Sequence, residues 1–132
     1  MDGIVFVVDD DPAVGKAVSR LLRANGYTTQ VFDSAQEFMN HYQPGIAACL
    51  LVDFSMPEIT GLELQQSLQA LGFPLSIVFL TGLDEIPEGE KTMMLKGAVG
   101  ILEKPVNTRA LLGCVEEALT RSRAAQGRQS AT

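Results

Sequence analysis

The sequence predicts an α/β protein in which five parallel strands, in the order 2-1-3-4-5, form one sheet with helices on both faces. Short apolar or β-branched segments alternate five times with segments of helical periodicity, a pattern typical of parallel strands joined by crossover helices. A length of 132 residues suits one compact domain. Acidic, hydroxyl and lysine side chains follow the strands, at the edge where such sheets hold their functional sites.

An acidic turn separates the first strand from the first helix. Ile4–Val8 is a β-branched run, and apolar positions at helical spacing begin soon after it. Asp11 followed by Pro12 indicates an N-cap with proline at the first helical position, and Gly26 indicates the end of the helix. Asp11 is therefore interpreted as a cap and not as a site residue.

The second unit repeats this pattern. Tyr27–Phe32 alternates as a strand does, and Ser34 with Glu37 forms a capping box ahead of a helix that carries Phe38. Ile46–Val52, the third strand, is apolar without alternation, as expected for a strand covered on both faces.

The third helix has a start signal and a stop signal. Thr60 with Glu63 is a second capping box, and the helix Leu62–Leu71 stops at Gly72. Leu75–Leu80 is the fourth strand, again continuously apolar.

The last third of the chain completes the alternation. Ile86–Lys96 is predicted to be a helix that Gly89 weakens, and Ala98–Leu102 to be the fifth strand. Asn107 is the predicted cap of a final helix that ends at Leu119.

Charge divides the chain unevenly. The net charge is −6, but a polar tail at residues 121–132 holds three arginines and no acid. The predicted domain at residues 1–120 therefore holds seven Lys or Arg against sixteen Asp or Glu, a net charge of −9, and we expect it to repel nucleic acid.

Apolar runs fall far short of the roughly 18 residues that span a bilayer, so we expect a cytoplasmic protein without membrane contact. Cys49 and Cys114 form no metal-binding or redox motif.

Five side chains follow the predicted strands at one edge of the sheet. Asp9 and Asp10 follow the first strand, Asp53 the third, Thr81 the fourth and Lys104 the fifth. Three carboxylates in one place repel one another, and a bound cation relieves that repulsion. Carboxylate ligands with room for water suit Mg²⁺, so we expect Mg²⁺ or another divalent cation here.

The same set of residues indicates phosphoryl transfer. Asp53 can act as a nucleophile, because carboxylates form aspartyl phosphates. Thr81 would then donate its hydroxyl to one phosphoryl oxygen, and Lys104 would place a positive charge beside another. Taken singly, each residue has an ordinary explanation as a turn acid, a packing residue or a surface cation. Their shared position favours the common role.

Four motifs in this order carry a family resemblance. They are V-D-D at Asp9, L-L-V-D-F-S-M-P-E-I-T-G-L-E-L around Asp53, F-L-T-G at Thr81 and L-E-K-P at Lys104. Together they resemble the response-regulator receiver domain of two-component signalling, over residues 4 to about 119. The wording M-P-x-x-T-G-L-E-L and G-A-V-x-x-L-E-K-P is similar to the FixJ branch, whose members usually continue into a LuxR-type helix-turn-helix. The resemblance implies the (βα)5, flavodoxin-like receiver fold.

The resemblance also implies a role for each site residue. By position, it implies Asp53 as phosphoacceptor, Asp9, Asp10, Asp53 and the backbone carbonyl of Ser55 as Mg²⁺ ligands, Thr81 and Lys104 as phosphoryl ligands, and a cis peptide bond between Lys104 and Pro105.

Partners follow from the same resemblance. It implies a sensor histidine kinase as phosphoryl donor and a signalling domain that is not an enzyme, with Mg²⁺-dependent autophosphorylation and autodephosphorylation. A phosphorylation-dependent homodimer would use the fourth helix, fifth strand and fifth helix, including Met93 and Met94 unless these belong to the core. The tail at 121–132 would be a linker to an output domain that binds DNA, which this domain itself would not bind.

Ile101 departs from the family pattern. The family usually places Phe or Tyr three residues before the lysine, where the ring moves inward as the threonine moves toward the phosphate. Ile101 is stiff at χ1 and has no ring, so we expect a smaller conformational response, with the loop from Thr81 to Ile86 carrying more of it.

Three other functions compete with this interpretation. A phosphohydrolase with an aspartyl nucleophile, as in haloacid-dehalogenase-like enzymes, needs a second Asp where Ser55 stands. A flavodoxin-like cofactor binder needs a phosphate-binding loop, but the acidic turn repels phosphate. The third is a phosphorylation-independent dimerisation or interaction scaffold with a receiver fold, which the substitution at Ile101 keeps open.

Overall fold

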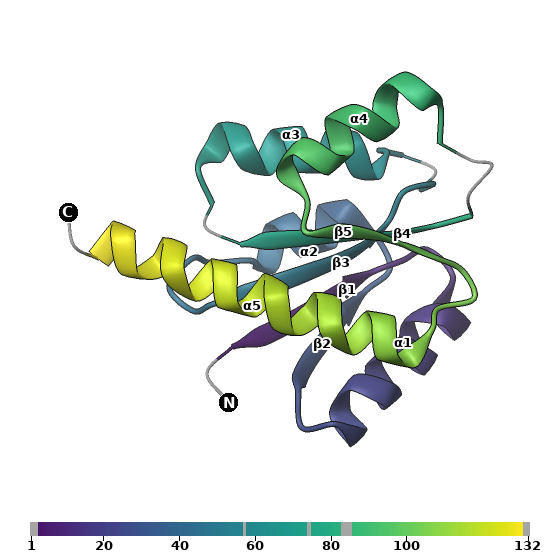
Figure 1. The fold of residues 1–132 in the computed structure, drawn as a ribbon, viewed down its shortest axis with the longest axis horizontal. Helices are drawn as coiled ribbons and strands as arrows, with labels where there is room; N and C mark the ends of the chain where they lie inside the picture. Colours follow the sequence, from purple (N-terminus) through teal and green to yellow (C-terminus); the bar gives the residue numbers. More distant parts are fainter. Residues whose placement is uncertain (1–2, 57, 74, 83–85, 131–132) are drawn as a thin grey trace.

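The computed structural model describes residues 3–56, 58–73, 75–82 and 86–130, with side chains up to residue 125 (Figure 1). The strands are β1 (Ile4–Val8), β2 (Thr28–Phe32), β3 (Ala48–Asp53), β4 (Ser76–Thr81) and β5 (Gly100–Glu103), and the helices are α1 (Pro12–Ala24), α2 (Ala35–His41), α3 (Gly61–Leu71), α4 (Glu88–Gly97) and α5 (Thr108–Ser130). Every strand begins or ends within two residues of its predicted bounds.

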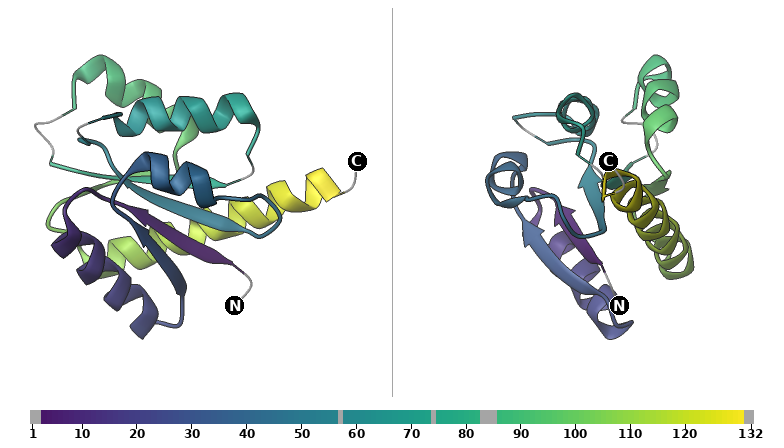
Figure 2. Two further views of the ribbon diagram at one scale, coloured as in Figure 1. Left: turned by 180° about the vertical axis from the view of Figure 1, so that it is seen from behind. Right: turned by 90° about the vertical axis from the view of Figure 1, so that its left-hand side faces the viewer.

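The five strands form one parallel sheet in the order β2-β1-β3-β4-β5, which confirms the predicted topology. Helices α1 and α5 cover one face, and α2, α3 and α4 cover the other (Figure 2). Two cores result, because alternate residues of each strand point to opposite faces. Val18 and Leu111 belong to the core beneath α1 and α5, whereas Phe38 and Met94 belong to the other.

The predicted caps define the ends of α1 and α3. Asp11 accepts a hydrogen bond from the Ala13 N–H, and Gly26 adopts φ +90° after the end of α1. Thr60 and Glu63 form a complete capping box, with side-chain-to-backbone bonds of 3.0 and 3.1 Å. These local signals fix where α1 begins and ends and where α3 begins.

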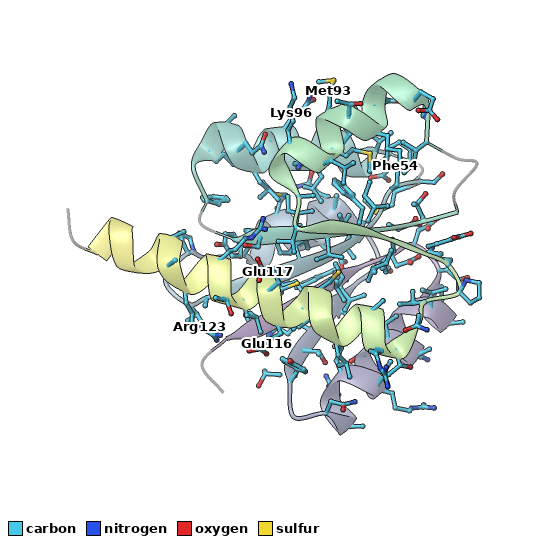
Figure 3. The ribbon with its side chains drawn as sticks, in the orientation of Figure 1. Phe54, Met93, Lys96, Glu116, Glu117 and Arg123 are labelled. Atoms are coloured by element: carbon cyan, nitrogen blue, oxygen red, sulfur yellow. The ribbon has the colours of Figure 1, made fainter. Side chains whose placement is uncertain are left out.

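Helix α4 is attached to the fold by few apolar contacts. It begins at Glu88, two residues after the predicted start at Ile86, and Pro87 at its N-cap position provides no side-chain cap. Met94 is its buried residue, whereas Met93 and Leu95 are half exposed. Met94 therefore belongs to the core, the alternative that the sequence left open for both methionines, whereas Met93 points away from the sheet (Figure 3).

Helix α5 is longer than the sequence predicts. The predicted end at Leu119 is wrong, since the helix continues to Ser130. Ser122 is buried and its hydroxyl oxygen accepts the Ala48 N–H at 2.8 Å, which ties the extension to the start of β3. Arg121 pairs with Glu117 at 2.9 Å, four residues earlier on the same helix.

Two further predictions from the sequence concern membrane-spanning segments and the two cysteines. Within the described residues, no helix combines the length and apolarity needed to cross a membrane. Cys49, which is buried, and Cys114, which is half-buried, are both free.

Candidate functional site

The carboxyl ends of β1 and β3 bring three carboxylates together. Asp9 directly follows β1, and Asp53 is the last residue of β3, the strand that pairs with β1. One oxygen from each of Asp9, Asp10 and Asp53 lies within 4.8 Å of the others. Asp9 and Asp53 are buried, with 1% and 4% exposure, whereas Asp10 is exposed to solvent. The cluster thus has a closed side and an open side.

Backbone amides orient the two buried carboxylates. The Asp11 N–H donates to Asp9 Oδ1 at 2.9 Å, and the Ser55 N–H donates to Asp53 Oδ1 at 3.2 Å. Sequence reasoning assigned Ser55 only a carbonyl ligand and Asp11 only a cap, so it missed both amides. The repeated spacing, an N–H two residues after each Asp, is the signal that points to them, because Asp side chains commonly bond the backbone two residues on.

Lys104 joins the acidic cluster from the other side. Its Nζ lies 3.1 Å from Asp9 Oδ2 and 3.4 Å from Asp53 Oδ1. The backbone holds the residue in place, because the Lys104 N–H donates to the Thr81 carbonyl at 2.9 Å. The peptide bond from Lys104 to Pro105 is cis, as the resemblance implies.

Burial, neighbouring charges and hydrogen bonds together shift the pKa values of Asp53 and Lys104. Burial, followed by the neighbouring Asp9 carboxylate, raises the pKa of Asp53 from 3.8 to about 6, although Lys104 and the Ser55 N–H act to lower it. Burial lowers the pKa of Lys104, but its bonds to the Asp9 and Asp53 carboxylates outweigh that and leave the pKa raised. The positive charge of Lys104 is therefore stabilised, whereas the ionised form of the Asp53 carboxyl group is destabilised.

Thr81 lies beside Asp53 without a hydrogen bond to it. Asp53 pairs with Leu80 in the sheet, which sets Thr81 one residue further along the adjacent strand. The Thr81 side chain is fully buried, and its hydroxyl donates to the Gly82 carbonyl at 2.8 Å. Asp9, Asp53 and Lys104 are thus in contact, Asp10 completes the acidic cluster, and Thr81 is turned toward its own backbone.

Ile101 lies in β5 opposite Phe79 and is partly buried against the core beneath α2, α3 and α4. Its effect on the conformational response remains a prediction. Residues 83–85 of the loop that was expected to carry more of that response lie outside the described residues.

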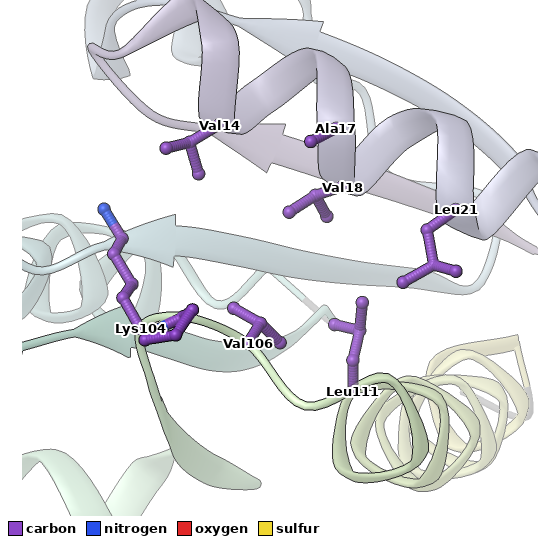
Figure 4. A pocket seen from close by; sticks show the side chains of 8 residues that line it. Val14, Ala17, Val18, Leu21, Lys104, Val106 and Leu111 are labelled. Carbon is purple, nitrogen blue, oxygen red and sulfur yellow. The ribbon is translucent and has the colours of Figure 1, made fainter.

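An apolar pocket borders the site next to Lys104. Its volume is about 260 Å³, and it opens between α1 and the segment that follows β5 (Figure 4). Val14, Val18 and Leu21 of α1 line one side, and Val106 and Leu111 line the other. Apart from Lys104 its lining side chains are apolar, so this pocket does not offer ligands for a metal ion.

The donor set fits a divalent cation. All three candidate side-chain ligands are carboxylates, the ligand type that Mg²⁺ prefers, and the exposed Asp10 leaves an approach from solvent. The positive charge of Lys104 offsets part of the attraction for a second cation. Such a balance suits an ion that is bound weakly and keeps several waters.

Comparison with known proteins finds relatives that are response regulators. A sequence profile of the response regulator receiver domain matches residues 5–116. The chain is 37% identical to the response regulator protein TodT of Pseudomonas putida over 116 residues, covering 88% of this chain and 51% of TodT. It is 38% identical to the transcriptional regulatory protein FixJ of Azorhizobium caulinodans over 125 residues, covering 95% of this chain and 58% of FixJ.

Solved structures agree. The response regulator StyR matches with a TM-score of 0.88 and 36% identity, covering 99% of this chain and 66% of StyR. Full-length FixJ from B. japonicum matches with a TM-score of 0.81 and 31% identity, covering 97% of this chain and 63% of that one. The chain spans about half the length of the curated relatives it matches. With a profile match over most of its length and relatives of this identity, the chain belongs to the response regulator receiver domain family.

Proposed function

We propose that this chain is the phosphorylation-controlled switch of a two-component system, with Asp53 as the phosphoacceptor and a sensor histidine kinase as the donor. The observation that carries this proposal is the buried Asp53 carboxylate, held between Lys104 and an acidic cluster at the ends of two adjacent strands. A purely structural acid would not be buried next to another carboxylate, because both burial and repulsion destabilise its charged form.

The contacts of Asp53 favour one oxygen as the nucleophile. Oδ1 accepts from the Ser55 N–H and faces Lys104, so Oδ2 is the oxygen proposed to attack. A new bond forms between Oδ2 and phosphorus, the P–N bond of the phosphohistidine breaks, and the imidazole leaves with its electron pair. Lys104 then places its charge beside a phosphoryl oxygen.

Asp9, Asp10, Asp53 and the Ser55 carbonyl would hold the Mg²⁺ ion, which supplies positive charge against the incoming phosphoryl group when bound. In this scheme Asp9 also keeps Lys104 in place, through their 3.1 Å contact. Autophosphorylation from small phosphodonors and autodephosphorylation would use the same residues.

Thr81 is the residue proposed to report phosphorylation. Its hydroxyl donates to the Gly82 carbonyl, and it must give up that bond to donate to a phosphoryl oxygen. The exchange would release the Gly82 carbonyl, directly after the end of β4. Phosphorylation would therefore act first on the contacts at this end of β4.

The output is proposed to be transcription, in line with relatives named as transcriptional regulators. From the sequence we place the domain in residues 1–120 and a linker to a DNA-binding output domain in residues 121–132. Because the buried Ser122 is bonded to Ala48, we extend the proposed domain to Ser122 and propose the residues after it as that linker. A phosphorylation-dependent homodimer would use the surface of α4, β5 and α5, where Met93 and Leu95 are half exposed. The domain would act in the cytoplasm, without membrane contact.

Acetyl phosphate labelling of the whole chain tests the proposal. We expect one acid-labile phosphoryl group per chain in Mg²⁺, none in EDTA, and none in Asp53→Asn. Asp33→Asn, which removes an exposed carboxylate outside the cluster, is the matched control and should label normally. A folded wild-type chain that takes no label would favour the phosphorylation-independent scaffold.

A further inference from the structure

We propose that a basic groove on α1 and β2 binds an acidic, extended segment of a partner protein. The basic groove is a hollow of about 340 Å³ lined by Lys16, Ser19, Arg20, Arg23 and Val31. It lies on the side of α1 that faces the edge strand β2, and it shares no lining residue with the apolar pocket beside Lys104. This inference does not depend on the phosphorylation of Asp53.

The charge of the groove is opposite to that of the domain. Residues 1–120 carry a net charge of −9 with only seven cations, and three of those seven line this one hollow. No acid lines it, and in the part of the chain that the structure describes, Lys16, Arg20 and Arg23 form no salt bridge. Their charges are therefore available to an anionic ligand.

Hydrogen bonds fix one of the cations in advance. The Arg23 guanidinium donates through Nε to Thr29 Oγ1 at 2.8 Å and through an Nη to the Thr29 carbonyl at 3.1 Å. Thr29 is buried, and its hydroxyl lies 2.7 Å from that of the buried Ser19. A guanidinium has five N–H donors, so most of them stay free to bind carboxylates. Prior fixation reduces the side-chain entropy lost on binding.

The shape of the groove favours an extended occupant. β2 is an edge strand that pairs only with β1 in the described sheet, and Val31 beside the groove is 41% exposed. Lys16, Arg20 and Arg23 follow one another along α1 at rises of about 6 and 4.5 Å. Side chains on one face of an extended strand repeat at roughly 6.7 Å. An extended segment with acids at alternate positions can therefore match these cations while its backbone pairs with β2.

A protein segment fits better than nucleic acid. The net charge of −9 on residues 1–120 repels a long phosphate backbone, whereas a short acidic segment contacts only the basic groove. The Thr29 carbonyl already accepts from Arg23, but the rest of the β2 edge that faces away from β1 offers backbone groups that a peptide can pair with and a nucleic acid cannot.

Fluorescence anisotropy with a labelled peptide of alternating Glu and Val tests this inference. We expect salt-sensitive binding to the whole chain and no binding of the Gln-Val counterpart. Lys16→Gln with Arg20→Gln should weaken binding by about tenfold, since two surface charge pairs are lost. Arg23 is left intact because it also holds Thr29.

Lys91→Gln with Lys96→Gln is the matched control, because it removes the same charge from α4. It should bind as the wild type does. Equal weakening in both double variants would overturn the proposal, as would an absence of binding at low salt, or equally tight binding of short duplex DNA or inorganic phosphate. Circular dichroism and urea unfolding establish that each variant is folded.

Discussion

Lys104 Nζ lies 3.1 Å from Asp9 Oδ2, so a cation after β5 neutralises a carboxylate after β1. Because Lys104 also contacts Asp53 at 3.4 Å, it competes with a divalent cation for two of the three carboxylates. We predict that Lys104→Gln binds Mg²⁺ about tenfold more tightly, since a nearby unit charge is removed. Titration calorimetry measures this, with Lys91→Gln as the control. Unchanged or weaker binding in Lys104→Gln would contradict it.

The raised pKa of Asp53 predicts a pH-dependent stability in the absence of metal. Burial and the Asp9 carboxylate raise that pKa from 3.8 to about 6. A raised carboxyl pKa contributes stability that is present below the unfolded value and lost as pH rises through about 6. Asp53→Asn stays neutral, so in EDTA it should gain roughly 1–3 kcal/mol over the wild type between pH 4 and pH 7.5.

Urea unfolding of both proteins across this pH range measures the difference. Asp33→Asn, an exposed site outside the cluster, controls for the loss of one carboxylate. A constant difference between Asp53→Asn and the wild type across the range would show that Asp53 ionises as easily in the folded chain as in the unfolded one.

Ser122 should show that the extension of α5 belongs to the folded domain. Its buried hydroxyl accepts the Ala48 N–H at 2.8 Å, and Ser122→Ala leaves that buried donor without this acceptor. We predict a loss of about 1–3 kcal/mol in the free energy of unfolding. Thr120→Ala removes an exposed hydroxyl two residues earlier and should cost much less. Equal effects of the two substitutions would argue against the anchor.

Helix α4 is predicted to be the least protected helix in hydrogen exchange. It buries Met94, starts without a side-chain cap and contains Gly89. A Cβ added at Gly89 would meet no atom within 4 Å, so Gly89→Ala should stabilise α4 by about 0.5–1 kcal/mol and slow its exchange. Gly113→Ala, equally unobstructed but in α5, should leave α4 exchange unchanged. Protection of α4 equal to that of β3 would contradict the prediction.

Local signals explain how much of the fold was predictable. The caps at Asp11 and Thr60 and the stop at Gly72 each depend on residues no more than four positions away. Such local signals can be recognised in the sequence. The other strands are recognisable as apolar runs, whereas β2 is recognisable by its alternation. Only their ends differ, by one or two residues.

Features that depend on distant partners were not predictable in this way. The polar stretch after Leu119 has no apolar periodicity, and it is helical partly because Ser122 meets Ala48 across 74 positions. The spacing of Glu117 and Arg121, four residues apart, was an available helix signal. Gln65 is buried because its amide donates to the Met94 carbonyl at 3.3 Å, a partner that no local pattern indicates.

In the candidate site, too, the positions of the residues were predictable but some of their contacts were not. Strand ends placed Asp9, Asp53 and Lys104 at one edge of the sheet, and the structure brings their charged groups into contact. Side-chain rotation is a different matter: the sequence could not predict that the Thr81 hydroxyl donates to Gly82. Backbone amides, such as that of Ser55, are equally invisible in residue types.

Reductive trapping is the most direct measurement of the central claim that Asp53 is the phosphoacceptor. Borohydride reduces an aspartyl phosphate to homoserine, which tandem mass spectrometry locates in the chain. After treatment with acetyl phosphate and Mg²⁺, we predict homoserine at position 53 and at no other aspartate. Homoserine at Asp9, Asp10 or Asp11, with position 53 unmodified, would contradict the assignment.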